Sequence, residues 1–449
     1  MTNRLTAGIN SKGVFLMFAF TVFLYNLVFP FLFLLYLPLF VFKLWKRGGV
    51  DGRYPERFAI FTAAQKAALA GLRRPVWVHA VSVGETVAAL TFIRRWRERR
   101  PDLTFVLSSS TTTGQEIARK KAPAGVVVIY CPLDWWPWVR RTVDLVKPAM
   151  LVIFEVEIWP NLLVQARRHG PVVLANGRMS DRSSASYARH AWFFRPLMSR
   201  FSALCVQDEE DARRFLKAAG EGAPIHVCNT MKFDQVPDLQ TKDLKQVLDQ
   251  FFGSGRRRCW VAGSTHAGEE KMVLDIFANL RRRFPDLKLI LVPRHAERSP
   301  EVVRLLEQME IPFRLLKEPV PGAGFADVLL VNTTGELMNF YAAADVVYVG
   351  KTLAGNSGGH NIIEPAIFGK PIIHGENMQN FRMVADIFKK ARATIEVRDA
   401  DGLAMAVFEI LSDRDLAVTL VSRSRQVVED QRGSIDRTID LYTPLLPPA

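Results

Sequence analysis

The sequence contains few cysteines and no paired cysteine motif. Its 449 residues include four cysteines, Cys131, Cys205, Cys228 and Cys259, and none belongs to a CxxC pair. Scattered cysteines in a long chain fit a reducing compartment, with buried thiols that behave as small apolar side chains. The histidines show no i, i+4 pair with a third ligand nearby, so we expect no structural zinc.

Signatures of nucleic-acid binding and of dinucleotide binding are also missing. The sequence has no zinc finger, no RNA-binding motif and no long basic tail, so nucleic acid is not an expected partner. No G-x-G-x-x-G follows the first expected strand of either half, which counts against a simple nicotinamide or flavin enzyme. The net charge of +14 still implies an acidic partner, and anionic lipid or a phosphorylated substrate remains.

The chain begins with a long uncharged stretch from Val14 to Phe42. It exceeds the roughly 20 residues that span hydrocarbon, and it is too long for a secretory signal. Residues 1–48 therefore predict an uncleaved single-pass membrane anchor with a basic flank. Pro30 and Pro38 should kink the helix or end it early. A half-buried hairpin or an interfacial helix is the alternative.

Cations are unequally distributed around this stretch. Only Arg4 and Lys12 precede it, whereas five cations follow within a short distance: Lys43, Lys46, Arg47, Arg53 and Arg57. This bias places the large C-terminal part in the cytoplasm, with the cations beside anionic headgroups. The run RRWRERR at 94–100 either adds to this basic surface or is an ordinary solvated helix face.

The rest of the chain alternates short apolar runs with amphipathic stretches, which is typical of βαβ units and parallel sheets. We expect strands at VWVHAVSV (76–83), LTFVLSSS, VVVIY, MLVIFEVE, VVLAN, ALCVQ and IHVCN. A second series follows at RRCWVAGS, LKLILVPR, FADVLLVN, ADVVYVG and KPIIHG. The predicted fold class is α/β, with Rossmann-like domains at 49–235 and 236–449 whose strand ends face a shared cleft.

Two acidic motifs follow expected strands of the first half. In HAVSVGE, Gly84 permits a sharp turn and Glu85 opens a helix, where its carboxylate either serves chemistry or only stabilises the helix end. In FEVEIWPN, Glu155 and Glu157 stand two residues apart and should share one face of the strand. A capping role would explain Glu157 but not Glu155, because burying an unpaired charge is expensive.

Two further motifs of the first half have weaker signals. The hydroxyls of SSSTTTGQE, residues 108–116, suit either oxyanion binding or plain helix capping. In NTMKFD, Lys232 could offset negative charge beside the cleft, or it could form a surface ion pair with Asp234.

The second half carries candidate nucleotide contacts. AGSTHAGEE (262–270), LVPRHAER and NTTGEL each end a strand, and the guanidinium of Arg294 suits phosphate. In KTLAGNSGGHNIIEPAIFGKPII, free N–H groups at Gly358 and Gly359 would cradle a phosphate. Glu364 lies on the same helix face as Asn361 and could accept both hydroxyls of a ribose.

Together these segments resemble the 3-deoxy-D-manno-octulosonic acid (Kdo) transferases, which glycosylate lipid A. The matching pieces occur in order along nearly the whole chain and are YPERF, HAVSVGE, SSSTTTGQE, FEVEIWPNL, NGRMSDRS, KFD, AGSTHAGEE, PRHAER, TGEL and GGHNIIEPA…GKPII. The resemblance implies a GT-B fold, the donor CMP-Kdo and a lipid A precursor, lipid IVA, as acceptor. It implies no cofactor, and we expect no essential metal.

The resemblance also implies roles for individual residues. Glu85 matches the general base, and Glu155 and Lys232 match residues that stabilise the transition state. The CMP contacts match Pro293, Arg294, Gly335, Glu336, Leu337, Asn361, Ile362, Ile363 and Glu364. The expected reaction is a single inverting displacement in lipopolysaccharide biosynthesis.

Three other functions remain open from the sequence. A membrane-associated transferase that uses a UDP-sugar would show a similar Glu364 region. A glycosidase could use Glu155 and Glu157, although glycosidase carboxylates flank the bond about 5–9.5 Å apart and these lie on one short segment. A lipid-binding scaffold without enzyme activity is the third.

Overall fold

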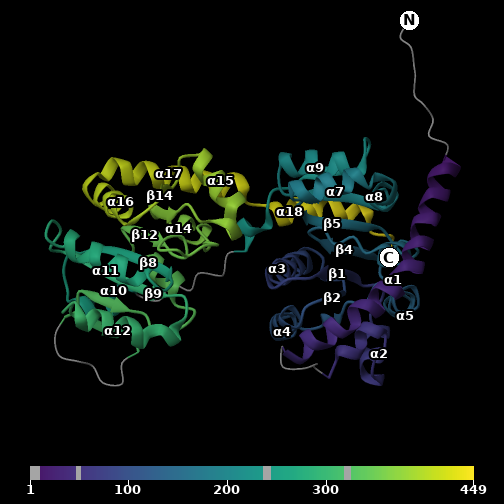
Figure 1. The fold of residues 1–449 in the computed structure, drawn as a ribbon, viewed down its shortest axis with the longest axis horizontal. Coiled ribbons are helices and arrows are strands. Elements are labelled where there is room, and N and C mark those ends of the chain that lie inside the picture. Colours follow the sequence, from purple (N-terminus) through teal and green to yellow (C-terminus); the bar gives the residue numbers. More distant parts are fainter. Residues whose placement is uncertain (1–10, 47–51, 236–243, 318–324, 449) are drawn as a thin grey trace, which may run out of the picture. The chain divides into compact units, whose positions relative to one another are not determined.

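The computed structural model describes residues 11–46, 52–235, 244–317 and 325–448, with side chains described from residue 18 to 39 in the first of these ranges. The chain forms two compact units (Figure 1). The first comprises Met1–Gln235 and Arg432–Ala449, and the second comprises Val236–Gln431. The expected boundary between the domains adjoins residues 236–243, which lie outside the described residues.

The first unit contains a parallel sheet of seven strands in the order β3-β2-β1-β4-β5-β6-β7. Its strands are β1 (Val76–Ala80), β2 (Phe105–Ser109), β3 (Val127–Tyr130), β4 (Met150–Phe154), β5 (Val172–Gly177), β6 (Phe201–Val206) and β7 (Ile225–Val227). Its helices are α1 (Ser11–Lys46), η1 (Tyr54–Phe58), α2 (Ala63–Ala70), α3 (Val83–Arg99), α4 (Thr112–Lys121), α5 (Trp136–Val146), α6 (Pro160–Ala166), α7 (Asp181–Arg189), α8 (Ala191–Met198), α9 (Glu209–Ala219), η2 (Met231–Asp234), α18 (Ser434–Tyr442) and η5 (Thr443–Leu445).

The second unit repeats this plan with the order β10-β11-β9-β8-β12-β13-β14. Its strands are β8 (Arg258–Thr265), β9 (Leu287–Pro293), β10 (Phe313–Leu315), β11 (Val328–Leu330), β12 (Val346–Val349), β13 (Ile372–Gly375) and β14 (Ile395–Val397). Its helices are α10 (Leu244–Phe252), α11 (Glu269–Leu280), η3 (Ala296–Arg298), α12 (Ser299–Gln308), α13 (Leu337–Tyr341), α14 (Ile363–Ile367), η4 (Gln379–Phe381), α15 (Arg382–Lys390), α16 (Ala400–Ser412) and α17 (Arg414–Gln431).

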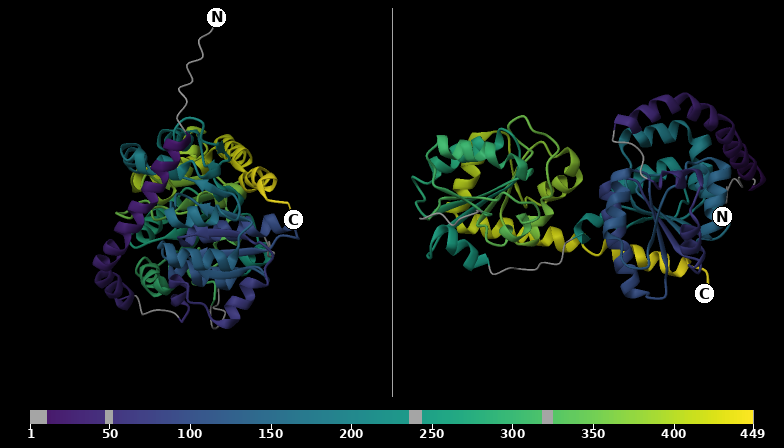
Figure 2. Two further views of the ribbon diagram at one scale, coloured as in Figure 1. Left: turned by 90° about the vertical axis from the view of Figure 1, so that its right-hand side faces the viewer. Right: turned by 90° about the horizontal axis from the view of Figure 1, so that it is seen from below.

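Each sheet is a doubly wound layer with helices on both faces (Figure 2). Because both faces are covered, the central strands are apolar throughout, and every residue of β1, β2 and β4 is buried. The strand order reverses beside β1 in the first unit and beside β8 in the second. Ligands of such folds bind outside the carboxyl ends of the strands at this reversal.

The predicted α/β fold is confirmed, and so is every strand that the apolar runs indicated. The strands β10 and β14 were not predicted. Each has only three residues and lies at an edge of the second sheet, where its residues are partly exposed and give no apolar run.

The apolar helix α1 packs one flank on the first unit and leaves the other flank exposed. Phe18, Thr21 and Val22 are buried, and Phe18 and Val22 belong to the core that contains Trp77. The opposite flank exposes large apolar side chains, namely Phe20, Phe23, Leu27, Phe31, Leu34, Leu35 and Leu39. Residues Phe18–Leu39 are long and apolar enough to cross a membrane, by length and composition alone.

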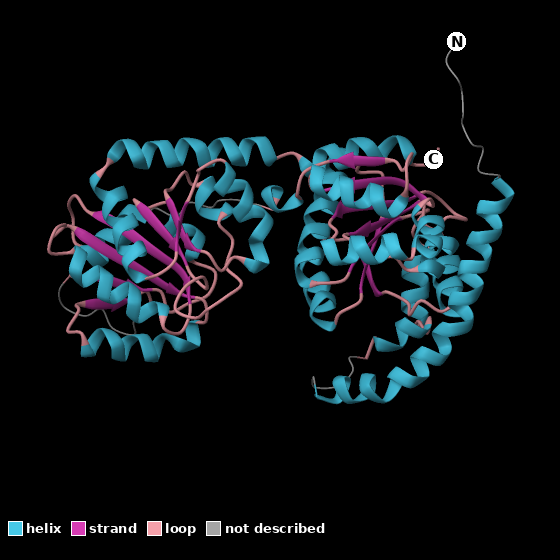
Figure 3. Ribbon diagram, turned by 45° about the horizontal axis from the view of Figure 1, so that its top comes forward, coloured by secondary structure: helices cyan, strands magenta, loops and turns pink. Residues whose placement is uncertain are grey.

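The prolines do not end this helix. Pro30 and Pro38 both lie inside α1, which continues to Lys46. Figure 3 shows the helix bending along the first unit, in agreement with the predicted kink.

Arg57 is not available to lipid headgroups, in contrast to the expectation from the basic flank. Its side chain is buried, donates to the Ser110 carbonyl oxygen and lies 4.9 Å from the ring centroids of Tyr54 and Tyr130. Glu56 beside it accepts a hydrogen bond of 2.7 Å from the Tyr130 N–H. The YPERF segment therefore ties the chain to β3. Arg47 lies outside the described residues.

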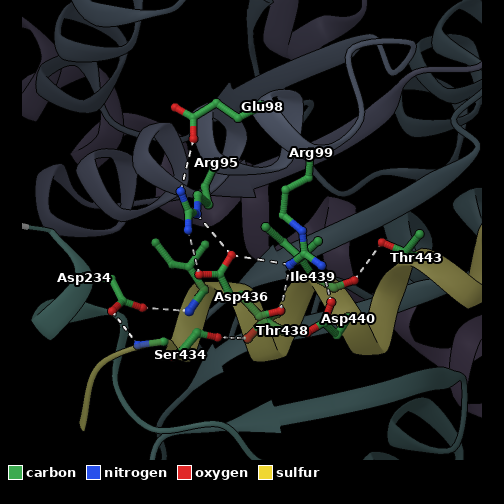
Figure 4. A network of polar contacts seen from close by, with 12 residues as sticks. Arg95, Glu98, Arg99, Asp234, Ser434, Asp436, Thr438, Ile439, Asp440 and Thr443 are labelled. Atoms are coloured by element: carbon green, nitrogen blue, oxygen red, sulfur yellow. Dashed lines mark hydrogen bonds and ion pairs between the residues drawn. The ribbon is translucent and has the colours of Figure 1, made fainter. Parts of the chain in front are cut away.

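The C-terminal segment belongs to the first unit and not to the second, where the sequence placed all of 236–449. The carboxylate of Asp234 accepts from the N–H groups of Gly433 and Ile435 at 2.8 and 2.7 Å, and so fixes the start of α18 (Figure 4). Ile439 and Tyr442 are buried in the core beneath α3. The contacts of Tyr442 with Phe92 and Trp96 join distant parts of the chain and have no signal in local sequence.

The arginine run at 94–100 serves this packing. Figure 4 shows Arg95 and Arg99 directed at α18, where Asp436 accepts from the Arg95 Nε at 3.0 Å. Arg99 pairs with Asp436 and Asp440. The run is therefore a solvated helix face that also forms ion pairs with α18, since the side chains of Arg95 and Arg99 remain 52% and 39% exposed.

We expect that Ile439→Ala lowers the free energy of unfolding of the first unit by about 2–4 kcal/mol, because a fully buried Ile side chain is lost and a cavity remains. The matched control is Leu216→Ala on α9 of the same unit, which is 43% exposed and should change stability by less than about 0.5 kcal/mol. Urea unfolding measures both variants. Equal effects would show that α18 is not part of the core.

Candidate functional site

The predicted catalytic residues of the first unit lie in segments that each follow a strand of its sheet. Glu85 lies in the first turn of α3 after β1, Glu155 lies in the loop after β4, and Lys232 lies in η2 after β7. These segments lie at the carboxyl edge of the sheet, where β1 and β4 flank the reversal of strand order and β7 is an edge strand. The pKa of Glu155 responds to the charges of Glu85 and Lys232, so the three side chains share one electrostatic environment.

Glu85 is held by a capping box. The helix α3 begins at Val83, two residues earlier than predicted, and Ser82 is its N-cap. The Glu85 carboxylate accepts from the N–H groups of Val81 at 2.8 Å and Ser82 at 3.2 Å, while the Ser82 hydroxyl accepts from the Glu85 N–H. This ordinary capping geometry orients a buried carboxylate and leaves further lone pairs on its oxygens.

Glu155 and Glu157 lie in a loop and not on a strand face. The strand β4 ends at Phe154, and Glu155 has the left-handed φ of 55°. Burial raises the pKa of Glu155 to about 6, and the charge of Glu85 adds to this effect. Burial raises the pKa of Glu157 to about 7, again with a contribution from Glu85. Burial and the neighbouring carboxylates thus raise the pKa of both acids above the ordinary value of a glutamate.

Two cations counterbalance these acids. Burial lowers the pKa of Lys232, with a further lowering by Arg178 and an opposing effect from Glu155. Arg178, in the loop after β5, also lowers the pKa of Glu155. The sequence singled out Lys232 but not Arg178, which was visible only as part of the family match NGRMSDRS. Its position after a strand was the signal that could have found it.

The hydroxyls of SSSTTTGQE are used within the fold. Ser108 accepts from the Trp77 indole at 2.7 Å and contacts the buried His79 at 3.0 Å. The Thr111 hydroxyl donates to the Val81 carbonyl at 2.7 Å and caps α4 through the Gly114 N–H. Of the two roles weighed from the sequence, capping is the one that the contacts show.

The second unit has a cavity of about 410 Å³ at the carboxyl edge of its sheet. Ser264, near the end of the reversal strand β8, lines it, and residues that follow β9, β11, β12 and β13 complete it. The lining residues are Ser264, Arg294, Gly335, Leu337, Met338, Tyr341, His360, Asn361, Glu364 and Phe381.

Five of the predicted CMP contacts meet in this cavity, and four do not line it. Those that meet are Arg294, Gly335, Leu337, Asn361 and Glu364. Ile362 and Ile363 are buried in the core, Pro293 closes β9, and the Glu336 carboxylate accepts from the Asn339 amide at 2.8 Å. The sequence did not single out Ser264, Met338, Tyr341, His360 or Phe381.

Asn361 and Glu364 interact as their spacing predicted. The Asn361 amide donates to Glu364 Oε1 at 3.2 Å. Burial raises the pKa of Glu364, while Asn361 and Arg294 oppose the rise. The remaining carboxylate oxygen suits hydroxyl donors such as those of a ribose.

The glycine-rich segment does not offer the free N–H groups that the sequence led us to expect. The Gly358 N–H donates to the Asn377 carbonyl and the Gln379 side chain, at 3.1 and 2.7 Å. The Gly359 N–H donates to the Lys351 carbonyl at 3.0 Å. The glycines instead allow close packing, because a Cβ on Gly359 would lie 2.4 Å from the Met378 sulfur.

Glu269 fixes the start of this segment. Its fully buried carboxylate accepts from the N–H groups of Lys351, Thr352 and Leu353 at 2.8 to 3.0 Å, and from the His266 N–H at 2.9 Å. Lys351 has a left-handed φ of 64°, so this clamp holds a strained turn.

Three histidines gather beside the cavity. The ring centroid of His266 lies 5.3 Å from that of His360 and 5.7 Å from that of His295. Burial lowers the pKa of His360 to about 3, with further lowering by His266, Arg294 and Lys351. Within the described part of the chain, the buried Nε2 of His360 has no hydrogen-bond partner. A neutral histidine with an unused nitrogen can donate to a bound anion.

Comparison with known proteins identifies the family. Residues 52–235 match the family described as 3-deoxy-D-manno-octulosonic-acid transferase (kdotransferase). The 3-deoxy-D-manno-octulosonic acid transferase of Haemophilus influenzae is 31% identical over 377 residues, which cover 83% of this chain and 87% of that protein. This chain belongs to the Kdo transferase family. The Kdo transferase of Chlamydophila psittaci is 27% identical over 427 residues, 95% of this chain and 96% of that one.

Solved structures show that this Kdo transferase family member has the GT-B fold. The UDP-GlcNAc 2-epimerase of Neisseria meningitidis, bound to UDP-GlcNAc, matches with a TM-score of 0.56 and covers 82% of this chain and 99% of its own. A glycosyltransferase of Rickettsia africae matches with a TM-score of 0.52 and covers 84% and 100%. Both are 11% identical, so the likeness concerns the fold. By its family, the chain is a glycosyltransferase.

The pKa of Glu157 makes the stability of the first unit depend on pH. Its rise from 4.5 to about 7 means that the folded state holds the proton more tightly, so stability falls as pH rises from about 4.5 to 7 and stays low above. We expect Glu157→Gln to flatten this fall and to stabilise the unit by about 1 kcal/mol at pH 8. Thermal unfolding between pH 5 and 8 measures it. A variant that keeps the wild-type slope would contradict the assignment.

Proposed function

We propose that this protein transfers Kdo from CMP-Kdo to a lipid A precursor, lipid IVA, in lipopolysaccharide biosynthesis. Family membership supports Kdo transfer. The observation that carries the finer proposal is the pairing of two built sites. One is a cluster of carboxylates and cations after β1, β4, β5 and β7. The other is a cavity with a ribose-type carboxylate and an arginine.

The cavity of the second unit suits a cytidine monophosphate. Glu364 would accept the ribose hydroxyls, with Asn361 holding it in place. Arg294 supplies a fixed cation for the phosphate, and Lys351 stands close enough to lower the pKa of His360. The N–H groups of Gly358 and Gly359 already donate hydrogen bonds within the loop. We therefore assign the other contacts of the phosphate seat, meaning the groups that bind the phosphate, to His360 and His266.

The proposed chemistry is a single inverting displacement. The acceptor hydroxyl oxygen attacks the anomeric carbon of Kdo, its proton passes to Glu85, and CMP leaves with the electron pair of the broken carbon–oxygen bond. The capping box holds Glu85 in one orientation before the reaction, which lowers the cost of reaching the transition state. Charge that grows on the leaving phosphate is stabilised by Arg294 and the neutral histidines.

Lys232 and Glu155 support this step. The donor sugar carries its own carboxylate, and Lys232 is the cation that we assign to the developing charge near it. Glu155 would hold Lys232 in place, because the two side chains interact electrostatically. Independence from any metal remains a prediction, and resistance of the activity to a chelator would test it.

We further propose attachment to the inner membrane, with the enzyme on the cytoplasmic side. The exposed apolar flank of α1 supports the attachment, and the cations that follow the helix in sequence support the orientation. Because α1 packs on the first unit from Phe18 onward, the contacts favour the interfacial alternative over a free-standing anchor.

The decisive experiment incubates the purified protein with CMP-Kdo and lipid IVA and detects the product by mass spectrometry. We expect Kdo-bearing lipid with the wild type. Glu85→Gln should lower turnover by about 10² or more, because the amide retains the capping box but cannot take a proton. CMP affinity should stay at the wild-type value. Near-normal turnover of this variant would remove Glu85 from the role of base.

The donor cavity has a separate test by calorimetry with CMP, cytidine and UDP. CMP should bind and UDP should not compete. Arg294→Ala and His360→Ala should weaken CMP binding about tenfold and leave cytidine binding unchanged, because only the phosphate contact is lost. Glu364→Gln is the contrasting variant and should weaken both ligands. Equal losses for CMP and cytidine in His360→Ala would exclude His360 from the phosphate seat.

A further inference from the structure

The apolar helix α1 carries a polar edge that faces the first unit. Tyr25 and Asn26 follow Thr21 by four and five residues. The three residues lie on the flank opposite the exposed phenylalanines and leucines. Polar side chains in a lipid-directed helix are costly unless they find partners. Thr21 is fully buried, so this edge is an interior surface.

The partners of this edge belong to the start of α6. The amides of Asn26 and Asn161 exchange two hydrogen bonds, at 2.8 and 3.0 Å. Asn161 is fully buried, and its amide also donates to the Asp134 carbonyl at 2.7 Å. The Tyr25 hydroxyl bonds to the Asp134 carboxylate.

Asp134 in turn caps α6. Its carboxylate accepts from the N–H groups of Asn161 and Leu162 at 3.0 and 2.9 Å. The N–H groups of a first helical turn have no acceptor within the helix, and a carboxylate is a good acceptor for them. The helix α1, the Asp134 carboxylate and the first turn of α6 are thus one connected polar network.

This network lies at the end of the loop that carries two of the acidic residues of the candidate site. Residues 155–159 connect β4 to α6 and carry Glu155 and Glu157. The buried strand fixes one end of this five-residue loop at Phe154, and the network fixes the other at Pro160. Because the loop continues directly into α6, a shift of α6 moves the end of the loop.

We propose that Asn26 is a positioning residue for the loop Glu155–Trp159, which it fixes through Asn161 and α6. The helix that contacts lipid is then also part of the scaffold of the active site. This inference rests on the proposed function, because it takes the carboxylate loop as part of the transfer site. A displacement of about 1 Å at a reacting group can lower a rate by about 10², so a small movement of the loop is enough to measure.

The test is Asn26→Leu in the full chain, assayed with CMP-Kdo and lipid IVA in membranes. Leu preserves the apolar character of α1, so the membrane-bound fraction should not change. We expect kcat to fall about tenfold or more, with no change in the KM for CMP-Kdo or in CMP affinity. The dependence of kcat on pH should also shift, because Glu155 and Glu157 change their surroundings.

The matched control is Phe23→Leu on the exposed flank of the same helix, which should keep wild-type kinetics. Asn26→Gln retains an amide and should recover part of the lost activity. In a double-mutant cycle with Asn161→Leu, the two losses should be less than additive, because each single change already removes both hydrogen bonds between the two amides.

Three outcomes would overturn the inference: wild-type kcat in Asn26→Leu, an equal loss in Phe23→Leu, or a loss that only follows the fraction of unfolded protein in thermal unfolding. If Asn26→Leu does not fold, Asn26→Gln decides, and an unchanged pH dependence together with reduced kcat would count against positioning. Failure of the proposed function is distinguishable, since then the wild type itself transfers no Kdo.

Discussion

Buried carboxylates that accept main-chain N–H groups hold the functional loops of both units. Glu269 clamps three successive residues of the loop after β12, and Asp134 caps α6 behind the acidic loop. Asp211 accepts from the Met179 N–H at 2.8 Å next to Arg178, and Asp234 fixes the start of α18 next to Lys232. A buried carboxylate without partners would be expensive, whereas several N–H donors stabilise its charged form. Each of these acids fixes backbone and leaves a neighbouring residue to interact with ligand.

This constraint explains why the same residue type has two roles here. The side chains of Glu85 and Glu269 both stand in the first turn of a helix that follows a strand at the reversal of strand order. Glu269 is fully buried and its oxygens are used by the loop that it clamps. Glu85 accepts fewer N–H groups and lies beside other acids and Lys232, so its remaining lone pairs face a site. Glu269 therefore has a structural role, whereas Glu85 keeps lone pairs for the role of base that we propose.

The sequence predicted what depends on local patterns and missed what depends on distant contacts. The apolar runs located the central strands, because strands buried on both faces consist of apolar residues. The spacing of Asn361 and Glu364 predicted their contact, which lies within one helical turn. The placement of α18 on the first unit and the contacts of Asn26 with α6 depend on residues more than 100 positions apart. No periodicity records such contacts. For the arginines at 95 and 99 the sequence left a basic surface and a solvated helix face open, because their partners on α18 lie 341 positions away.

The glycine-rich segment shows how one composition can serve two purposes. Glycines after a strand suggest free N–H groups for a phosphate, yet at Gly358 and Gly359 those groups are bonded within the loop. Their φ angles of 114° and 69°, and the close approach of Met378, require glycine for conformational and steric reasons. The loop presents His360 to the cavity, so a phosphate bound there as we propose would meet side chains in place of backbone. If side chains bind the phosphate, its affinity depends on their protonation and can be changed by single substitutions. Binding by backbone N–H groups lacks both properties.

Charge does not account for membrane attachment as simply as composition suggests. Arg57, which the sequence placed beside headgroups, lies against the rings of Tyr54 and Tyr130, and Arg95 and Arg99, for which a lipid-facing surface was one of two alternatives, bind the acids of α18. These guanidinium groups are committed to the fold, so they contribute to the net charge of +14 without offering it to headgroups. What α1 does offer is a continuous apolar flank, and burial of apolar area is insensitive to salt. The same helix is bonded through Asn26 to the scaffold of the acidic loop. Under the two proposals, lipid contact and the geometry of the site depend on opposite faces of one helix.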